Sequence, residues 1–302
     1  MTTTLTQEFQ QAPSAWRFMA DALRSRPGLV KAGGVPAIVL TWRDWKCGGP
    51  ELAAISELTG LGAQQPLSIL APHILTFRLN MALLTHPAFP LPLLGALQIR
   101  NQLLQHHAVQ PGTAYCVSTA VAGQRVLEKG AEVDLHTQVS QDGQVLWESL
   151  NTFYYRGRFG PASPPSAGAA SPAVRGEETR RWHAPGGSGW RFGGLTGDYN
   201  GIHWSRQYAR AFGFRRDFHN PPRVLGQCLA HLGQAFGDSG QRLDTWLKGP
   251  VYYDADLRLQ LQQSPDALCF ALSQDQDERP AIVARWRRCG DQERLLEPLA
   301  CS

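Results

Sequence analysis

The sequence predicts an α+β fold made of two similar units, each with one apolar helix and an antiparallel sheet. The chain has 302 residues, which suits two units of about 150 residues each. In each half, a helical segment precedes several strand-like segments. A stretch rich in Pro, Ala, Ser and Gly separates the halves and has the composition of a flexible linker. We therefore predict an N-terminal unit over residues 1–160, a linker over 161–178 and a C-terminal unit over 179–302.

The first half contains one helix candidate among several strand candidates. Residues 72–85 are apolar on all sides, which predicts a buried helix. Such a helix can be covered by a sheet that wraps around it. Strand-like segments lie at residues 35–42, 95–104 and 113–123. Residues 130–157 form two alternating runs around "QDG" at positions 141–143, which predicts a β-hairpin.

The second half repeats this order. Residues 205–214 predict a short helix, and residues 223–237 carry an apolar stripe typical of a longer one. The small residues of this longer helix permit close packing against it; they are Gly226, Ala230 and Gly233. Strands are expected within residues 246–264, 267–276 and 280–288.

The composition excludes several classes of protein. Hydrophobic residues make up 43% and charged residues 18%, as in a globular chain rather than a disordered one. The net charge of +4 is too mild for a nucleic-acid scaffold. No apolar run has the length of a membrane span, and residues 1–16 do not resemble a secretory signal. The cysteines form no C-x-x-C pair, and the adjacent His106 and His107 would point to opposite faces of a strand, so we expect no metal site and a cytoplasmic protein.

The segment "LTGDYNGIH" at residues 195–203 is the candidate catalytic site. A carboxylate and an imidazole can share one water, because one group removes its proton while the other orients it. Asp198 and His203 supply these groups, and the intervening "DYNG" is typical of a turn. In the alternative interpretation, Asp198 only caps a helical segment and His203 is a partly buried structural histidine.

Residues 195–205 resemble the signature of the MaoC-like acyl dehydratases and R-specific enoyl-CoA hydratases. In that family a small or hydroxyl residue is followed by Gly, Asp, any residue, Asn, Pro, an aliphatic residue, His, any residue, and Asp or Ser. The matching residues here are Thr196, Gly197, Asp198, Asn200, Ile202, His203 and Ser205, whereas Gly201 stands in place of the proline. The resemblance is specific over residues 195–236. It implies a double hot-dog fold, in which each of two long helices is wrapped by an antiparallel sheet.

The resemblance also implies roles for individual residues. Asp198 and His203 would hold and activate a water molecule, while Gly197 and Asn200 would fix the turn. Backbone N–H groups near the start of the second long helix would polarise the thioester carbonyl, because a helix N-terminus favours negative charge. The expected donors are Val224, Leu225 and Gly226. Pro221 and Pro222, which precede them, have no N–H to offer.

The first half has no Asp and His of this kind, so we interpret it as a degenerate unit that supplies the acyl pocket. The pocket is expected to be lined by Phe89, Leu93, Leu94 and the apolar helix of residues 72–85, which could alternatively be ordinary core and packing between the units. Arginines before the second long helix suit the phosphates of coenzyme A or of a phosphopantetheine arm, although they could equally form a solvated surface. These arginines are Arg215, Arg216 and Arg223.

The expected function is that of an acyl-thioester hydro-lyase, which reversibly hydrates a trans-2-enoyl-CoA to a 3-hydroxyacyl-CoA. We expect no cofactor, because the thioester itself acidifies the α-carbon. The expected partner is an acyl-CoA or acyl-carrier thioester, without nucleic acid or membrane, and the chain could assemble as a homodimer. A non-catalytic acyl-thioester-binding module is the alternative, but such a module has no evident need for Asp198 and His203.

Overall fold

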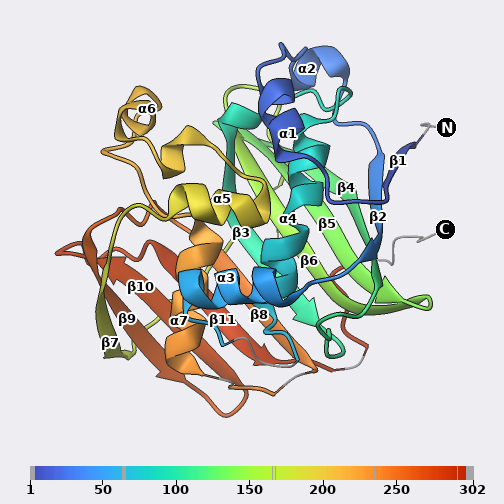
Figure 1. Cartoon of the computed structure of the whole chain (residues 1–302). Coiled ribbons are helices and arrows are strands. Elements are labelled where there is room, and N and C mark those ends of the chain that lie inside the picture. Colours follow the sequence, from blue (N-terminus) through green and yellow to red (C-terminus); the bar gives the residue numbers. More distant parts are fainter. Residues whose placement is uncertain are drawn as a thin grey trace.

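The chain forms one large sheet with its helices gathered on one face (Figure 1). The computed structural model describes residues 4–62, 66–164, 166, 168–233, 235–237, 239–290 and 292–296. Within these ranges, no helix has the length and apolarity that a membrane crossing requires.

The elements fall into two series along the chain. The strands of the first half are β1 (Leu5–Phe9), β2 (Ile38–Trp45), β3 (Ala96–Gln105), β4 (Tyr115–Leu127), β5 (Gly130–Gln141) and β6 (Gln144–Arg156). Those of the second half are β7 (Glu177–Ala184), β8 (Gln241–Leu247), β9 (Ala255–Gln263), β10 (Ala267–Gln274) and β11 (Ile282–Arg288). The helices are α1 (Ala15–Ala22), α2 (Leu29–Ala32), α3 (Gly49–Thr59), α4 (Leu70–Thr85), α5 (Gly189–Thr196), α6 (Arg206–Ala211) and α7 (Pro221–Leu232), with short 3-10 helices η1 (Leu93–Gly95) and η2 (Gly201–His203).

The strands pair in the order β1-β2-β4-β5-β6-β3-β8-β11-β10-β9-β7, which makes one eleven-stranded sheet. β3 of the first half pairs antiparallel with β8 of the second, so the two halves share a continuous sheet. The predicted hairpin is present, with Asp142 and Gly143 at φ 50° and 77° in the turn between β5 and β6. The predicted α+β double hot-dog architecture is therefore confirmed.

The two long helices lie where the apolar patterns place them. Every residue of α4 except Arg78 is buried, as expected of a helix that a sheet surrounds. The second long helix, α7, ends at Leu232 rather than near residue 237. Gly233 follows with φ 70° and ends the helix, so the last apolar residues of the predicted stripe lie beyond it.

The small residues of α7 do receive a close neighbour, as predicted. A Cβ on Gly226 would lie 2.6 Å from the Cβ of Thr59, the last residue of α3. Several elements were not predicted from the sequence: the helices α1, α2, α3 and α5, the two short 3-10 helices, and the strands β1 and β7. Most of β8 also lies before the strand expected from residue 246. The predicted strand at 246–264 is also interrupted, because β8 ends at Leu247 and β9 begins at Ala255.

The segment predicted as a linker contacts strands of both halves. The amide of Ser163 donates to the carbonyl of Val126 on β4, and the indole of Trp246 on β8 donates to the carbonyl of Gly168. Val174 packs against Trp246 in a small apolar cluster. The last two residues of the predicted linker, 177 and 178, already belong to β7, while residues 165 and 167 lie outside the described ranges.

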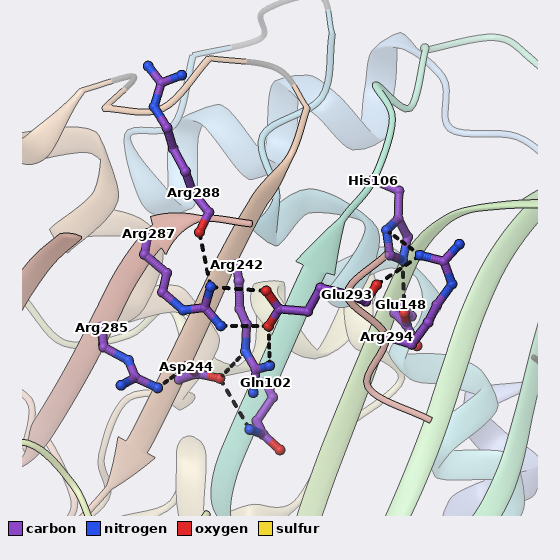
Figure 2. Close-up of polar contacts among 10 residues, drawn as sticks. All are labelled: Gln102, His106, Glu148, Arg242, Asp244, Arg285, Arg287, Arg288, Glu293 and Arg294. Atoms are coloured by element: carbon purple, nitrogen blue, oxygen red, sulfur yellow. Dashed lines mark hydrogen bonds and ion pairs between the residues drawn. The ribbon is translucent and has the colours of Figure 1, made fainter. Parts of the chain in front are cut away.

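A polar network ties the two halves together where β3 meets β8 (Figure 2). The buried carboxylate of Asp244 accepts hydrogen bonds from Gln102 on β3, Arg242 on β8 and Arg285 on β11, at 3.2, 2.8 and 3.0 Å. Figure 2 also shows Glu293 of the C-terminal segment between Arg242 and Arg287, with an ion pair to Arg242 of 2.6 Å. This network therefore joins both halves and the C-terminal segment.

Replacing Asp244 with alanine is expected to destabilise the fold by about 3 kcal/mol, because three part-buried donors lose a buried, charged acceptor. Denaturant unfolding measures this loss. The matched control is Asp277→Ala, since Asp277 is exposed and pairs only with the exposed Arg279; it should cost less than about 1 kcal/mol. Equal losses for the two variants would contradict a structural role for the buried network.

Candidate active site

A chain of local hydrogen bonds builds the turn that carries Asp198 and His203. α5 ends at Gly197, whose φ of 77° reverses the chain. The hydroxyl of Thr196 accepts from the amide of Asp198 at 3.2 Å. One carboxylate oxygen of Asp198 accepts from the amide of Asn200 at 3.1 Å, and the side-chain oxygen of Asn200 accepts from the amide of Ile202 at 3.3 Å. The polar side chains of the turn thus fix its backbone, as Asx and ST turns do.

Asp198 and His203 face each other at the distance of a water-mediated pair. The second carboxylate oxygen of Asp198 lies 3.7 Å from Nε2 of His203, with side-chain exposures of 20% and 6%. This separation is too long for a direct hydrogen bond, yet one water can contact both atoms. The sequence-based expectation of a nearby acid and imidazole therefore agrees with the geometry.

The tautomer of His203 follows from its other nitrogen. Nδ1 lies 3.0 Å from the carbonyl oxygen of Phe218, and since a carbonyl only accepts, Nδ1 carries the proton. Nε2 of the neutral ring is then a base that points toward Asp198. Burial lowers the pKa of His203, and this effect exceeds the opposing influence of the Asp198 carboxylate. The imidazole is therefore neutral near neutral pH and able to accept a proton.

Glycines allow the close packing around the catalytic turn. Gly201, which replaces the proline of the family signature, lies under the ring of Tyr208, and a Cβ there would come within 2.7 Å of that ring. A Cβ on Gly189, at the start of α5, would lie 1.8 Å from the carbonyl oxygen of His203. The same oxygen accepts a hydrogen bond of 2.7 Å from the hydroxyl of Tyr253. Here the ring of Tyr208 occupies the space that a proline would need.

Asp198 and His203 line a cavity of about 110 Å³ whose walls come from both halves of the chain. Asp198, Asn200 and His203 line one side. The apolar side is formed mostly by α4 and by the segment around β3 and β6: Phe77, Met81, Leu84, Leu93, Ala96, Leu97 and Phe153. The first half therefore supplies the greater part of the apolar wall.

Of the individually predicted pocket residues, one lines the cavity and two do not. Leu93 lines the cavity, whereas Phe89 is fully buried with its ring 6.4 Å from that of Tyr155. Leu94 is half-buried and is not among the lining residues. Phe77 and Met81 belong to the apolar helix that was expected to line the pocket, although neither was named individually. Phe153 on β6 was not expected there.

The prediction that backbone N–H groups of Val224, Leu225 and Gly226 donate to the thioester carbonyl is corrected, because α7 begins before these residues. The helix begins at Pro221, so Val224, Leu225 and Gly226 lie one turn into it, where N–H groups bond to carbonyls of the preceding turn. All three are buried, and none lines the cavity. The residues of this region that do line the cavity are Asn220, directly before the helix, and Pro221 and Pro222, its first two residues.

The three arginines differ in their availability for an anion. Arg223 is buried and bonded to His219, so it is not the surface phosphate ligand that the sequence suggested. Arg216 pairs with Asp254 at 2.9 Å. Arg215 is exposed, lies over the ring of Tyr252 at 4.5 Å from its centre, and has an exposed ion pair of 3.8 Å with Asp275. Arg215 alone of the three remains an accessible candidate.

Comparisons with known proteins agree with the predicted resemblance to the MaoC-like dehydratases. No family model matches the chain. Among curated proteins it is similar to 3-hydroxyacyl-thioester dehydratase X of Mycobacterium tuberculosis, with 27% identity over 225 residues, which are 70% of this chain and 76% of that protein. The predicted resemblance is therefore confirmed.

Solved structures agree on the fold. The crystal structure of HtdX of Mycobacterium tuberculosis superposes with a TM-score of 0.72 and 23% identity, covering 83% of this chain and 99% of that one. A MaoC-like dehydratase of Phytophthora capsici gives a TM-score of 0.64 and 14% identity, covering 85% and 96% of the two chains. This chain has the double hot-dog fold of these proteins.

Buried histidines predict that the fold loses stability in mild acid. Burial lowers the pKa of both His73 and His219 to about 3. In the unfolded chain both protonate below about pH 6.5, so stability is fully present above that pH and is lost as the pH falls. At about pH 5 the loss is about 2 kcal/mol for each histidine. Denaturant unfolding above about pH 6.5 and at about pH 5 measures the free energy of unfolding at each pH. The loss between the two should be about 2 kcal/mol smaller in His73→Leu than in the native chain. An unchanged loss would contradict the buried neutral state of His73.

Proposed function

We propose that this chain is an acyl-thioester hydro-lyase that reversibly adds water to a trans-2-enoyl thioester to give a 3-hydroxyacyl thioester. The observation that carries the proposal is the base Nε2 of His203, held 3.7 Å from a carboxylate oxygen of Asp198 in a cavity whose remaining lining is mostly apolar. The activity of the curated relative, a 3-hydroxyacyl-thioester dehydratase, supports the same reaction class.

Asp198 and His203 have different roles toward one water molecule in the proposed reaction. One oxygen of Asp198 is held by the amide of Asn200, which leaves the other free to accept a hydrogen bond from the water. His203 removes a proton as the water oxygen bonds to C3, and the electrons of the double bond move onto the thioester oxygen. The imidazolium then returns a proton to C2, so that the sum of the steps is the addition of one water. Dehydration follows the same path in reverse.

The carrier arm needs a route from the cavity to the surface. A second cavity of about 260 Å³ shares Leu97, Gln98, Phe218 and Pro221 with the first and is otherwise bordered by residues 247–251 and Phe214. We place the pantetheine arm of coenzyme A or of a carrier protein here. The exposed Lys248 at its border and Arg215, which follows Phe214 in the chain, are proposed to meet the phosphates.

The localisation and the oligomeric state of the protein stay predictions. We propose a cytoplasmic enzyme that can assemble as a homodimer, and sedimentation equilibrium of the purified chain measures the assembly directly.

Mixing the protein with crotonyl-CoA tests the proposed function. A hydro-lyase lowers the absorbance of the conjugated thioester until equilibrium with 3-hydroxybutyryl-CoA is reached. Starting from 3-hydroxybutyryl-CoA, the same absorbance should rise to the same equilibrium. A non-catalytic acyl-thioester-binding module would bind either compound and leave the absorbance of both solutions constant.

A further inference from the structure

The start of α7 lacks the usual donors of a helix N-terminus. The first two helical residues are Pro221 and Pro222, which have no N–H. The third N–H, that of Arg223, donates to the backbone carbonyl of Asn220 at 3.0 Å. None of the N–H groups of the helix's first three residues can therefore turn toward the cavity.

Asn220 stands at the N-cap of this helix, yet its side chain does not cap it. A capping side chain accepts from the second or third N–H of the helix. Here the second belongs to a proline and the third is taken by the carbonyl of Asn220 itself. Capping therefore does not explain why an amide side chain stands at this position.

The amide group of Asn220 is buried and has no hydrogen-bond partner among the described residues. Asn220 is 3% exposed, its Oδ1 is an unpaired buried atom, and its Nδ2 makes no bond to any described side chain or backbone group. Other polar residues of the cavity wall are engaged: Gln98 donates to Asn151, and Asn200 accepts from Ile202. A buried amide without a partner costs free energy, so a ligand that bonds to it is the expected compensation; the unpaired Oδ1 can only accept, whereas Nδ2 is the atom that can donate to a carbonyl oxygen.

The loop before α7 places Asn220 beside the catalytic pair. Phe218 uses its carbonyl to hold His203, and its amide donates to the carbonyl of Ile202 at 3.2 Å. The amide of His219 donates to Val251 at 2.9 Å. Asn220 follows directly and lines the same cavity as Asp198 and His203. The loop that orients the base thus also presents the unpaired amide.

We propose that the side-chain amide of Asn220 donates a hydrogen bond to the thioester oxygen of the substrate and stabilises the enolate, a role that backbone N–H groups of the helix's first turn cannot fill. This inference rests on the proposed function. As water adds to C3, negative charge moves to the thioester oxygen, and it returns to the carbon chain when C2 is protonated. A fixed donor in a buried site stabilises this charge most when it is greatest, which makes Asn220 a catalytic residue that touches the substrate.

Two substitutions separate the side chain from the backbone. Asn220→Gly removes the amide side chain, keeps the backbone N–H, and costs only a few tenths of a kcal/mol at an N-cap. Asn220→Asp keeps the shape, but the ionised carboxylate cannot donate and repels the enolate. Both variants should lower kcat for crotonyl-CoA about 100-fold while KM changes by less than about threefold. Circular dichroism and thermal melting check that each variant is folded.

A spectrum without turnover tests the hydrogen bond itself. 2,4-Hexadienoyl-CoA absorbs at longer wavelength when its carbonyl is polarised, and the His203→Ala background prevents its hydration. We expect a red shift on binding to His203→Ala, and its loss in His203→Ala/Asn220→Gly at similar affinity. A red shift that persists in the double variant, or near-normal kcat in Asn220→Gly, would overturn the proposal in favour of a backbone donor. The spectrum decides the role of Asn220 even if the native chain fails to hydrate crotonyl-CoA, which would overturn the proposed function alone.

Discussion

Replacing His203 with alanine is expected to lower kcat for crotonyl-CoA hydration about 100-fold or more, because the water loses the base that takes its proton. Asp198→Asn should give a loss of the same order, since an amide holds the water but no longer stabilises the imidazolium. Neither side chain supports the sheet, and the backbone of the turn is fixed by its own hydrogen bonds. Both variants should therefore remain folded, and steady-state kinetics with circular dichroism measures both outcomes.

Matched controls come from a pair outside the cavity. His183 and Asp256 form an exposed pair with Nδ1 and Oδ1 3.1 Å apart. His183→Ala and Asp256→Asn repeat the same chemical changes away from the site and should keep nearly native kcat. A His203→Ala or Asp198→Asn variant with near-normal kcat would show that the assigned roles are wrong.

Replacing Leu93 with tryptophan is expected to reduce turnover of long enoyl-CoAs about tenfold or more relative to crotonyl-CoA. Leu93 lines the apolar side of the cavity, with Phe77, Met81 and Leu84 of α4. We propose that the acyl tail runs into this part of the N-terminal half. An indole there would fill space that a long chain needs and that a four-carbon chain does not reach.

The neighbouring Leu94 provides the control for this substitution. It is half-buried and does not line the cavity, so Leu94→Trp should change kcat/KM for both chain lengths little and alike. Comparing kcat/KM for dodecenoyl-CoA and crotonyl-CoA in both variants measures the effect. Equal losses for both chain lengths in Leu93→Trp would show that the tail does not enter the N-terminal half.

Much of the fold could be predicted because its signals are local. The apolar face pattern of α4 and the turn residues Asp142 and Gly143 each specify their element within a few residues. The edge strands lack such a signal. β7 is mostly exposed along its length and carries mainly charged side chains, so no alternation of buried and exposed positions marks it. β1 is short and pairs in parallel with β2, a contact that depends on tertiary structure.

The candidate site likewise has residues that the sequence predicts and residues that only the structure brings together. Asp198 and His203 lie on one turn, so their spacing in the sequence already brings them together. The apolar wall of the cavity joins α4, β3 and β6, which are far apart in the chain. The helix and Leu93 were predicted to line it, whereas the residues of β3 and β6 were not. The role proposed for Asn220 depends on which N–H groups the first turn of α7 uses. That information appears only once the start of the helix at Pro221 is known.

The fate of isotopically labelled water tests the central claim most directly. Crotonyl-CoA is incubated with the protein in ¹⁸O-labelled water, and the products are analysed by mass spectrometry. The proposed hydro-lyase gives 3-hydroxybutyryl-CoA with the label in its 3-hydroxyl group and the thioester intact, and His203→Ala slows its formation. Recovery of crotonyl-CoA without any labelled 3-hydroxybutyryl-CoA, or of free coenzyme A with the label in a released carboxylate, would contradict the account.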